Sequence, residues 1–383
     1  MKAWAIGLTF WAWVSFVAAR TTYLPAQALE QVNVAMQEQF PDNQPGAAIV
    51  VLQKDSILFV KGYGWADKLT QKPVTPRTNF CLASISKQFT AVAVLQLCEQ
   101  GKMSLDDKVK KFFPNFTHSV WDKITVRHLL SHTSGIPDAR NGYTRLERIY
   151  ANDDRAVEFF PSVVKLRYEP GTAYAYLNPS FVLASKIVEK VSGEEFGAYM
   201  QKHVFRPAKM FNTRYFEFET LSATAEKVET REVPIPCMAH GYVKKGNGWK
   251  EYDFGEETFY ATRADGALYS SVTDMAHWEM ALQHGTLLLP KTIQQAWTPQ
   301  ISVSESSYSD YNGHPNTYYG LGWFIEPATA TQAKVIYHTG ENGGFHNIVA
   351  RYPQKDVMVA ILSTRPNWSQ YDFLQRVEQI LDL

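Results

Sequence analysis

The sequence shows no concentration of charge of either sign. Its 383 residues include 38 lysines and arginines and 38 aspartates and glutamates, and no block of like charge stands out. Nucleic-acid grooves and polybasic membrane anchors both need clustered positive charge. We therefore expect no nucleic-acid partner and no electrostatic anchoring at a membrane surface.

Cysteine is scarce. Cys81, Cys98 and Cys237 are the only three, and no pair has the CxxC spacing. Because three is an odd number, at least one thiol is unpaired or pairs between chains. Cys81 and Cys98 fit core positions around a buried helix, so the fold is not expected to depend on disulfides. Whether any of the cysteines pair stays open.

Long apolar runs are missing after the first twenty residues. The one such run, residues 3–17, follows a basic start and ends in small residues at positions 17–19. This order is typical of a secretory signal peptide, predicted here as residues 1–19. An N-terminal membrane anchor is the alternative, but the run is shorter than the ~20 apolar residues that a span needs. We expect a periplasmic or secreted protein with no stable membrane span after signal removal.

Strand patterns occur near both ends of the chain, and helix patterns fill the middle. Two apolar, β-branched runs joined at Lys54-Asp55 predict a hairpin. Further strands are predicted at 333–340, 345–353 and 356–364, and helices at 25–40, 84–100, 106–113, 125–131, 178–193, 272–285 and 368–381. The stretch 215–260 is mixed and polar, with weak strand signals, and we interpret it as a variable region that frames a site.

This arrangement predicts an α+β fold: an antiparallel sheet built from both chain ends and flanked by helices, with an inserted, mainly helical region. Residues 20–383 would form one domain after the signal peptide. Within it, residues 20–80 and 260–383 form the sheet lobe, and residues 81–259 form the mainly helical lobe.

Ser84 and Lys87 are the first candidates for chemistry. Residues three apart on a helix share a face, so the serine hydroxyl would lie beside the lysine amine. A serine becomes a nucleophile when a base takes its proton, and a lysine can be that base when burial or nearby charge lowers its pKa. The helix N-terminus would also direct N–H groups at developing negative charge. SxxK alone is a weak pattern, which chance explains unless other motifs support it.

Other motifs do support it. Tyr176-Leu177-Asn178 and, on a predicted strand, His338-Thr339-Gly340 follow in order, with LLSHTSGIPD (129–138) between the first motif and the second. With this set the sequence resembles the serine β-lactamase and penicillin-binding-protein superfamily, most closely its class C branch. The resemblance covers about residues 25–381, where GALYSSVTDMAHW (266–278) and YGLGW (319–323) also fit. It implies the β-lactamase/DD-peptidase-like fold.

The resemblance implies a role for each motif residue. Ser84 corresponds to the acylated nucleophile, Lys87 to its base, and Tyr176 to the tyrosine that passes protons to and from the leaving group. Asn178 corresponds to the amide that steadies the lysine and the substrate carbonyl. The oxyanion hole would consist of the backbone N–H groups of Ser84 and Glu341.

The third motif, His338-Thr339-Gly340, departs from one pattern of the resembled family at its first position. His338, Thr339 and Gly340 are expected to contact substrate, yet β-lactamases and many carboxypeptidases of the superfamily have lysine where His338 stands. A histidine is cationic only near or below its pKa of ~6.5. Histidine there is similar to peptidase and esterase relatives, and it argues against efficient β-lactam hydrolysis.

Two other kinds of site were weighed. His128 and His132 have zinc-ligand spacing, but Leu129 stands where a zinc protease needs glutamate. His338 with His346 and a carboxylate is another weak candidate. Gly340–Gly344 is glycine-rich but lacks the Lys-Ser/Thr of a phosphate loop. We therefore expect no metal and no cofactor.

The sequence thus predicts an exported serine hydrolase that acts through an acyl-enzyme on amide or ester bonds. The substrate is expected to be a small molecule or short peptide, with D-amino-acid peptides or small esters favoured. A class C β-lactamase or D-alanyl-D-alanine carboxypeptidase is one alternative, and a catalytically silent binding protein on the same fold is another. The oligomeric state and the substrate stay open.

Overall fold

The computed structural model describes residues 23–137, 153–223, 228–253, 262–309, 314–330 and 332–383. The predicted signal peptide, residues 1–19, lies outside the described residues. Within the described ranges, none of the helices combines the length and the apolar character that crossing a membrane requires.

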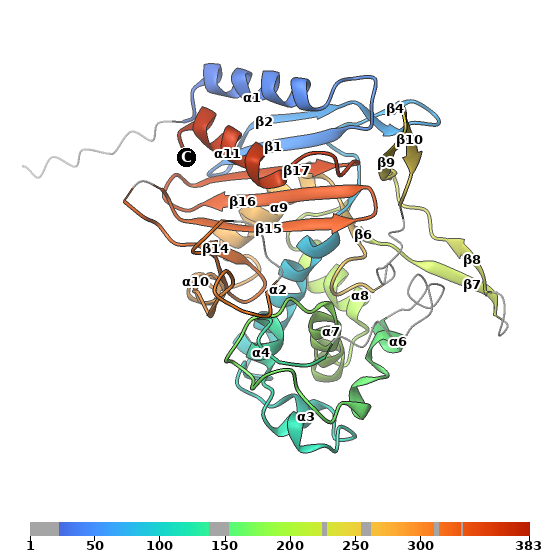
Figure 1. Ribbon diagram of the computed structural model, residues 1–383, viewed down its shortest axis with the longest axis vertical. Helices are drawn as coiled ribbons and strands as arrows, with labels where there is room; N and C mark the ends of the chain where they lie inside the picture. Colours follow the sequence, from blue (N-terminus) through green and yellow to red (C-terminus); the bar gives the residue numbers. More distant parts are fainter. Residues whose placement is uncertain (1–22, 138–152, 224–227, 254–261, 310–313, 331) are drawn as a thin grey trace, which may run out of the picture.

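One antiparallel sheet of eight strands, in the order β12-β13-β14-β15-β16-β17-β1-β2, organises the molecule (Figure 1). The two ends of the chain meet where β1 pairs with β17, from Ala47 opposite Ser363 to Gln53 opposite Val357. The predicted α+β fold is therefore confirmed. The strands are β1 (Ala47–Gln53), β2 (Ser56–Tyr63), β12 (Ile301–Ser302), β13 (Tyr318–Tyr319), β14 (Phe324–Glu326), β15 (Val335–Asn342), β16 (Phe345–Tyr352) and β17 (Val357–Ser363).

Strand β1 is buried on both faces, which explains its unbroken apolar sequence. Ala47, Ile49 and Val51 belong to the core beneath α1 (Ala26–Gln39) and α11 (Gln370–Leu381). The alternate residues of β1 belong to the opposite core, which α9 (Val272–Gln283) shares. The hairpin predicted at Lys54-Asp55 is confirmed, with Lys54 in the left-handed conformation of the turn (φ 55°).

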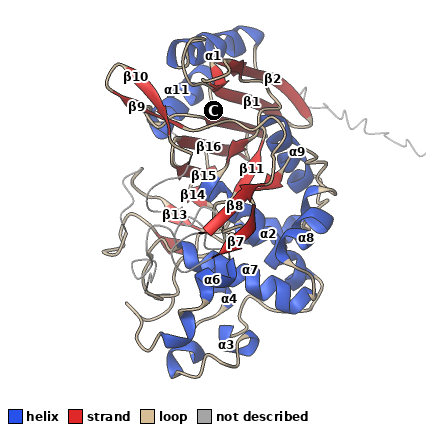
Figure 2. Cartoon of the chain, turned by 90° about the vertical axis from the view of Figure 1, so that its right-hand side faces the viewer, coloured by secondary structure: helices blue, strands red, loops and turns tan. Residues whose placement is uncertain are grey.

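The helical region lies on the face of the sheet away from α1 (Figure 2). Its centre is α2 (Ser86–Glu99), which is buried on nearly every side, as its sequence predicts. The other helices are α4 (Val126–Leu130), α6 (Asp153–Val157), α7 (Asn178–Ser192), α8 (Phe196–Met200) and α10 (Pro290–Ala296).

The helix predicted at 106–113 is shorter than expected, because α3 comprises only Val109–Phe112. Asp107 is engaged in a turn instead: its carboxylate accepts from the Ser104 amide at 2.9 Å, and its own amide donates to the Ser104 carbonyl at 3.1 Å. Short acidic side chains favour such local bonds over helix continuation.

The stretch 215–260 contains more strand than its weak signals suggested. β6 (Arg214–Tyr215) pairs with β11 (Leu268–Ser270), which also pairs with β5 (Phe80–Cys81). Two hairpins follow, β7 (Phe218–Ala223) with β8 (Val228–Glu232) and β9 (Tyr242–Lys245) with β10 (Gly248–Glu251). All three cysteines are free thiols.

Candidate active site

Ser84 lies in a single 3-10 turn, η1 (Ala83–Ile85), and the α-helix begins only at Ser86. The predicted helix start at Ser84 is thus corrected by two residues. The reason is the backbone of Ala83, which has a φ of 48°, a conformation that costs a non-glycine residue energy. This bend turns the chain sharply from β5 into α2, with Leu82 held by a 2.7 Å bond from its amide to the Leu268 carbonyl.

Lys87 is fully buried, and its amine contacts the predicted nucleophile. Nζ lies 3.0 Å from Ser84 Oγ and 2.9 Å from the backbone carbonyl of Asp265. The amine also lies over two aromatic rings, 4.9 Å from the ring centre of Tyr176 and 5.8 Å from that of Phe181. The structure therefore brings together the three residues predicted as catalytic.

Asn178 is the first residue of α7, and its side chain does not cap that helix. Its side-chain oxygen Oδ1 is buried and has no hydrogen-bond partner among the described residues. A buried acceptor without a partner is costly, so a structural cap does not explain this asparagine. A role toward substrate stays a prediction.

The third motif lies on the half of β15 that extends past β14. Among the described strands, β14 pairs only with residues 335–337 of β15. The same edge of β15 is therefore not paired with β14 at positions 338–342, and β15 contacts η1. A side chain at Gly340 would place its Cβ 2.0 Å from the Leu82 carbonyl oxygen. Glycine is thus required for β15 to approach the turn that carries Ser84.

Ser84 and Glu341, the two residues predicted to supply oxyanion N–H groups, lie on these adjacent elements, η1 and β15. The Glu341 side chain is exposed and lies 3.9 Å from His346 Nδ1. Thr339 is half-buried between His338 and Gly340. The oxyanion role itself stays a prediction.

His338 is buried, and each of its ring nitrogens is in a hydrogen bond. Nδ1 lies 2.6 Å from the Thr339 carbonyl and therefore carries the proton, while Nε2 accepts from the Tyr319 hydroxyl at 3.0 Å. Burial, followed by the charge of Lys87, lowers the pKa of His338 to about 3. At neutral pH the third motif therefore begins with a neutral imidazole.

His128 and His132, set aside as zinc ligands, have other partners. His128 Nδ1 accepts from the Thr125 amide at 3.2 Å as part of the cap of α4. His132 Nδ1 accepts from the Leu177 amide at 3.0 Å, and its ring centre lies 4.3 Å from that of Tyr176. Full burial holds the pKa of His132 well below its usual value.

Sequence reasoning missed several residues that support the site. Tyr319 and the Asp265 carbonyl were not singled out, and His132 was considered only as a metal ligand. Asn347 of β16 was also missed: its Nδ2 donates to the Cys81 carbonyl at 2.8 Å and the Gly340 carbonyl at 3.3 Å. An asparagine within a predicted strand was the available signal, because asparagine is uncommon in strands.

Comparison with known proteins identifies the family of the chain. The family described as Beta-lactamase matches residues 34–381. Penicillin-binding protein 4* of Bacillus subtilis (strain 168) is 26% identical over 352 residues, which are 88% of this chain and 73% of that protein. A protein named Beta-lactamase from Escherichia coli (strain K12) is 27% identical over 368 residues, 86% of each chain.

Solved structures give the same result. The octameric penicillin-binding protein homologue from Pyrococcus abyssi superposes with a TM-score of 0.74 at 26% identity, covering 93% of this chain and 77% of that one. The penicillin-binding protein from Bacillus halodurans superposes with a TM-score of 0.71 at 25% identity, covering 92% and 98%. The chain therefore belongs to the β-lactamase family, within the superfamily of serine β-lactamases and penicillin-binding proteins.

Proposed function

We propose that this protein is an exported serine hydrolase that forms an acyl-enzyme at Ser84 and cleaves amide or ester bonds. The observation that carries the proposal is the 3.0 Å separation between the buried amine of Lys87 and Ser84 Oγ. This distance lies within the range in which a base can take a hydroxyl proton. The likeness to a β-lactamase and to penicillin-binding proteins supports it.

The proposed reaction has two halves. Ser84 Oγ bonds to the substrate carbonyl carbon as Lys87 takes its proton, and backbone N–H groups of Ser84 and Glu341 stabilise the oxyanion. The carbonyl then reforms, the bond to the leaving group breaks, and Tyr176 delivers the proton to that group. In the second half water attacks the ester carbon and loses a proton to Tyr176, which gave up its own proton in the first half. The bond between that carbon and Ser84 Oγ then breaks, Lys87 returns its proton to Oγ, and the acid is released.

Tyr176 is suited to this proton transfer by its position, since its ring centre lies 4.9 Å from the Lys87 amine and 4.3 Å from the centre of the His132 ring. Asn178, at the start of α7, is proposed to steady Lys87 and the substrate carbonyl. His338, Thr339 and Gly340 are proposed to line the substrate, and residues 215–260 to frame it.

The neutral state of His338 bears on the substrate class. A lysine at this position would offer a fixed positive charge to a substrate carboxylate, whereas His338 is uncharged at neutral pH and both ring nitrogens are engaged. Substrates that need such a cation, including β-lactams and peptides with a free C-terminal carboxylate, are therefore disfavoured. Small esters and amides, including those of D-amino acids, are favoured.

A substrate panel tests this proposal. Purified protein is assayed with nitrophenyl esters, D-amino-acid amides and a chromogenic cephalosporin, alongside Ser84→Ala and the matched control Ser86→Ala. Ser86 lies two residues away with a buried hydroxyl that has no hydrogen-bond partner in the described structure, so its loss should leave turnover intact. We expect turnover of an ester or amide that Ser84→Ala abolishes. Faster cephalosporin hydrolysis would favour the β-lactamase alternative, and no turnover of any compound would favour a silent binding protein.

A further inference from the structure

A second cluster of ionisable side chains lies at the open end of the β9–β10 hairpin and shares no residue with the Ser84 site. Tyr242 pairs with Glu251 in the antiparallel register, so the next positions outward bring His240 opposite Asp253. Residues two apart along a strand face the same side, which puts Glu251 on the face shared by His240 and Asp253. The hairpin register itself therefore gathers one imidazole and two carboxylates.

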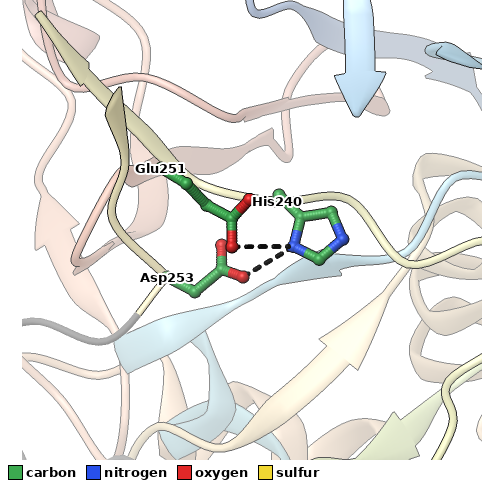
Figure 3. Close-up of side chains that lie close together, drawn as sticks. All are labelled: His240, Glu251 and Asp253. Atoms are coloured by element: carbon green, nitrogen blue, oxygen red, sulfur yellow. Dashed lines mark hydrogen bonds and ion pairs between the residues drawn. The ribbon is translucent and has the colours of Figure 1, made fainter. Parts of the chain in front are cut away.

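Figure 3 shows both carboxylates directed at the same ring nitrogen of His240. Nδ1 lies 2.7 Å from Asp253 Oδ2 and 3.8 Å from Glu251 Oε1. These ligand atoms all lie within 4.8 Å of one another. Ligands on a tetrahedral zinc ion, with bonds of about 2.0–2.1 Å, stand roughly 3.3 Å apart, so small side-chain rotations would bring all three onto one ion.

The cluster is anchored on one side and open on the other. The Asp253 carboxylate is only 6% exposed and also accepts a hydrogen bond from the Gly241 amide. The side chains of His240 and Glu251 are 31% and 54% exposed, so an ion can enter from solvent. Asp253, Glu251 and the nearby Asp67 surround His240 with negative charge. The same excess of negative charge favours a cation.

We propose that His240, Glu251 and Asp253 bind one divalent transition-metal ion. One imidazole nitrogen with two carboxylate oxygens suits zinc and its neighbours better than calcium or magnesium, which prefer oxygen ligands alone. Binding displaces the proton from Nδ1 of His240. Water would complete the coordination on the exposed side.

The place of the cluster suggests what the ion does. Tyr252, between the two carboxylate residues, accepts a hydrogen bond from the Gly344 amide at 2.8 Å, and Tyr242 donates to the Thr364 carbonyl at 2.7 Å. Gly344 lies in the turn between β15 and β16, three residues after Glu341. A bound ion would thus hold the open end of the β9–β10 hairpin against the turn between β15 and β16. We therefore infer a structural role for the ion.

Calorimetric titration of untagged, chelator-treated protein with zinc chloride tests the proposal. We expect one zinc ion per chain and a zinc-dependent rise in melting temperature. Glu251→Gln and His240→Gln should each weaken binding at least about tenfold, since even outer-shell changes cost a metal site that much. Glu251→Gln leaves the bond between His240 and Asp253 in place and removes an exposed group, so it tests the site without unfolding the hairpin.

Two controls separate this site from others. His203→Gln removes a histidine that also contacts a carboxylate, Glu194, at 2.8 Å. Cys237→Ser removes the exposed thiol nearest in sequence. Both variants should bind zinc like the wild type. Absence of stoichiometric binding, or binding that Glu251→Gln and His240→Gln leave unchanged, would overturn the proposal.

Discussion

The Tyr319 hydroxyl donates to Nε2 of His338 at 3.0 Å, and this bond fixes the form of the third motif. With Nδ1 directed at the Thr339 carbonyl, His338 has no free nitrogen and no charge at neutral pH. The first position of the third motif is therefore part of the buried hydrogen-bond network.

Removing the hydroxyl of Tyr319 should therefore destabilise the fold. Tyr319→Phe leaves Nε2 of His338 buried without a donor, which costs about 1–3 kcal/mol in the free energy of unfolding. Urea unfolding followed by circular dichroism measures the difference. Tyr318→Phe, at the half-buried neighbouring position, is the matched control and should change stability by less than about 0.5 kcal/mol. Equal effects of the two variants would contradict the account.

Asp153 should make the protein less stable as the pH rises. Burial, with the Asp265 charge adding, raises the pKa of this carboxyl to about 7. The folded state therefore holds a proton that the unfolded state has lost above pH ~4, so unfolding free energy falls by up to about 1.4 kcal/mol per pH unit from pH ~4 to 7. Asp153→Asn, which can still accept from the Arg263 amide, should be more stable than wild type at pH 8, and this advantage should be clearly smaller at pH 5.

Urea unfolding at pH 5 and pH 8 measures that advantage. Asp154→Asn is the control, because this neighbouring aspartate is 74% exposed in its ion pair with Lys186. Its effect on stability should be nearly the same at both pH values. An advantage of Asp153→Asn that does not change with pH would refute the assignment.

A side chain at Gly340 should damage catalysis. The Cβ of Gly340→Ala would lie 2.0 Å from the Leu82 carbonyl, which forces β15 away from the Ser84 turn. If the Glu341 amide stabilises the oxyanion, kcat for an ester should fall by about 10²–10³, the usual cost of one lost donor. Gly248→Ala, where the nearest atom is 3.9 Å away, should leave kcat unchanged. Unchanged kcat in a folded Gly340→Ala protein would show that β15 does not supply the donor.

The parts of the fold that follow from local sequence were predictable. The β-branched runs at 46–64 and 333–364 predicted five strands of the sheet, β1, β2, β15, β16 and β17. Where a strand is buried on both faces, as β1 and β17 are, it leaves little choice of residue. Ser84 and Lys87 have a spacing that a helix turn fixes, whereas Tyr176 and the third-motif strand were predicted from the resemblance to the superfamily of serine β-lactamases and penicillin-binding proteins.

The features that were not predictable depend on contacts between distant segments. The Lys87 amine meets the carbonyl of Asp265, 178 residues away, and backbone carbonyls leave no mark in the sequence. The neutrality of His338 depends on burial and on Tyr319, so the residue type alone could not reveal it. The left-handed backbone at Ala83, which puts Ser84 in a 3-10 turn, is imposed by the surrounding structure on a residue that does not favour it.

The central claim is that Ser84, with Lys87 as its base, is the residue that becomes acylated. Intact-mass spectrometry after treatment with a fluorophosphonate probe tests it most directly, on the wild type, Ser84→Ala, Lys87→Met and Ser86→Ala. The account predicts one adduct on the wild type and on Ser86→Ala, none on Ser84→Ala, and labelling slowed by about 10²–10⁴ on Lys87→Met, the usual contribution of a positioned base. An adduct of equal yield on Ser84→Ala, or no adduct on the wild type, would contradict it.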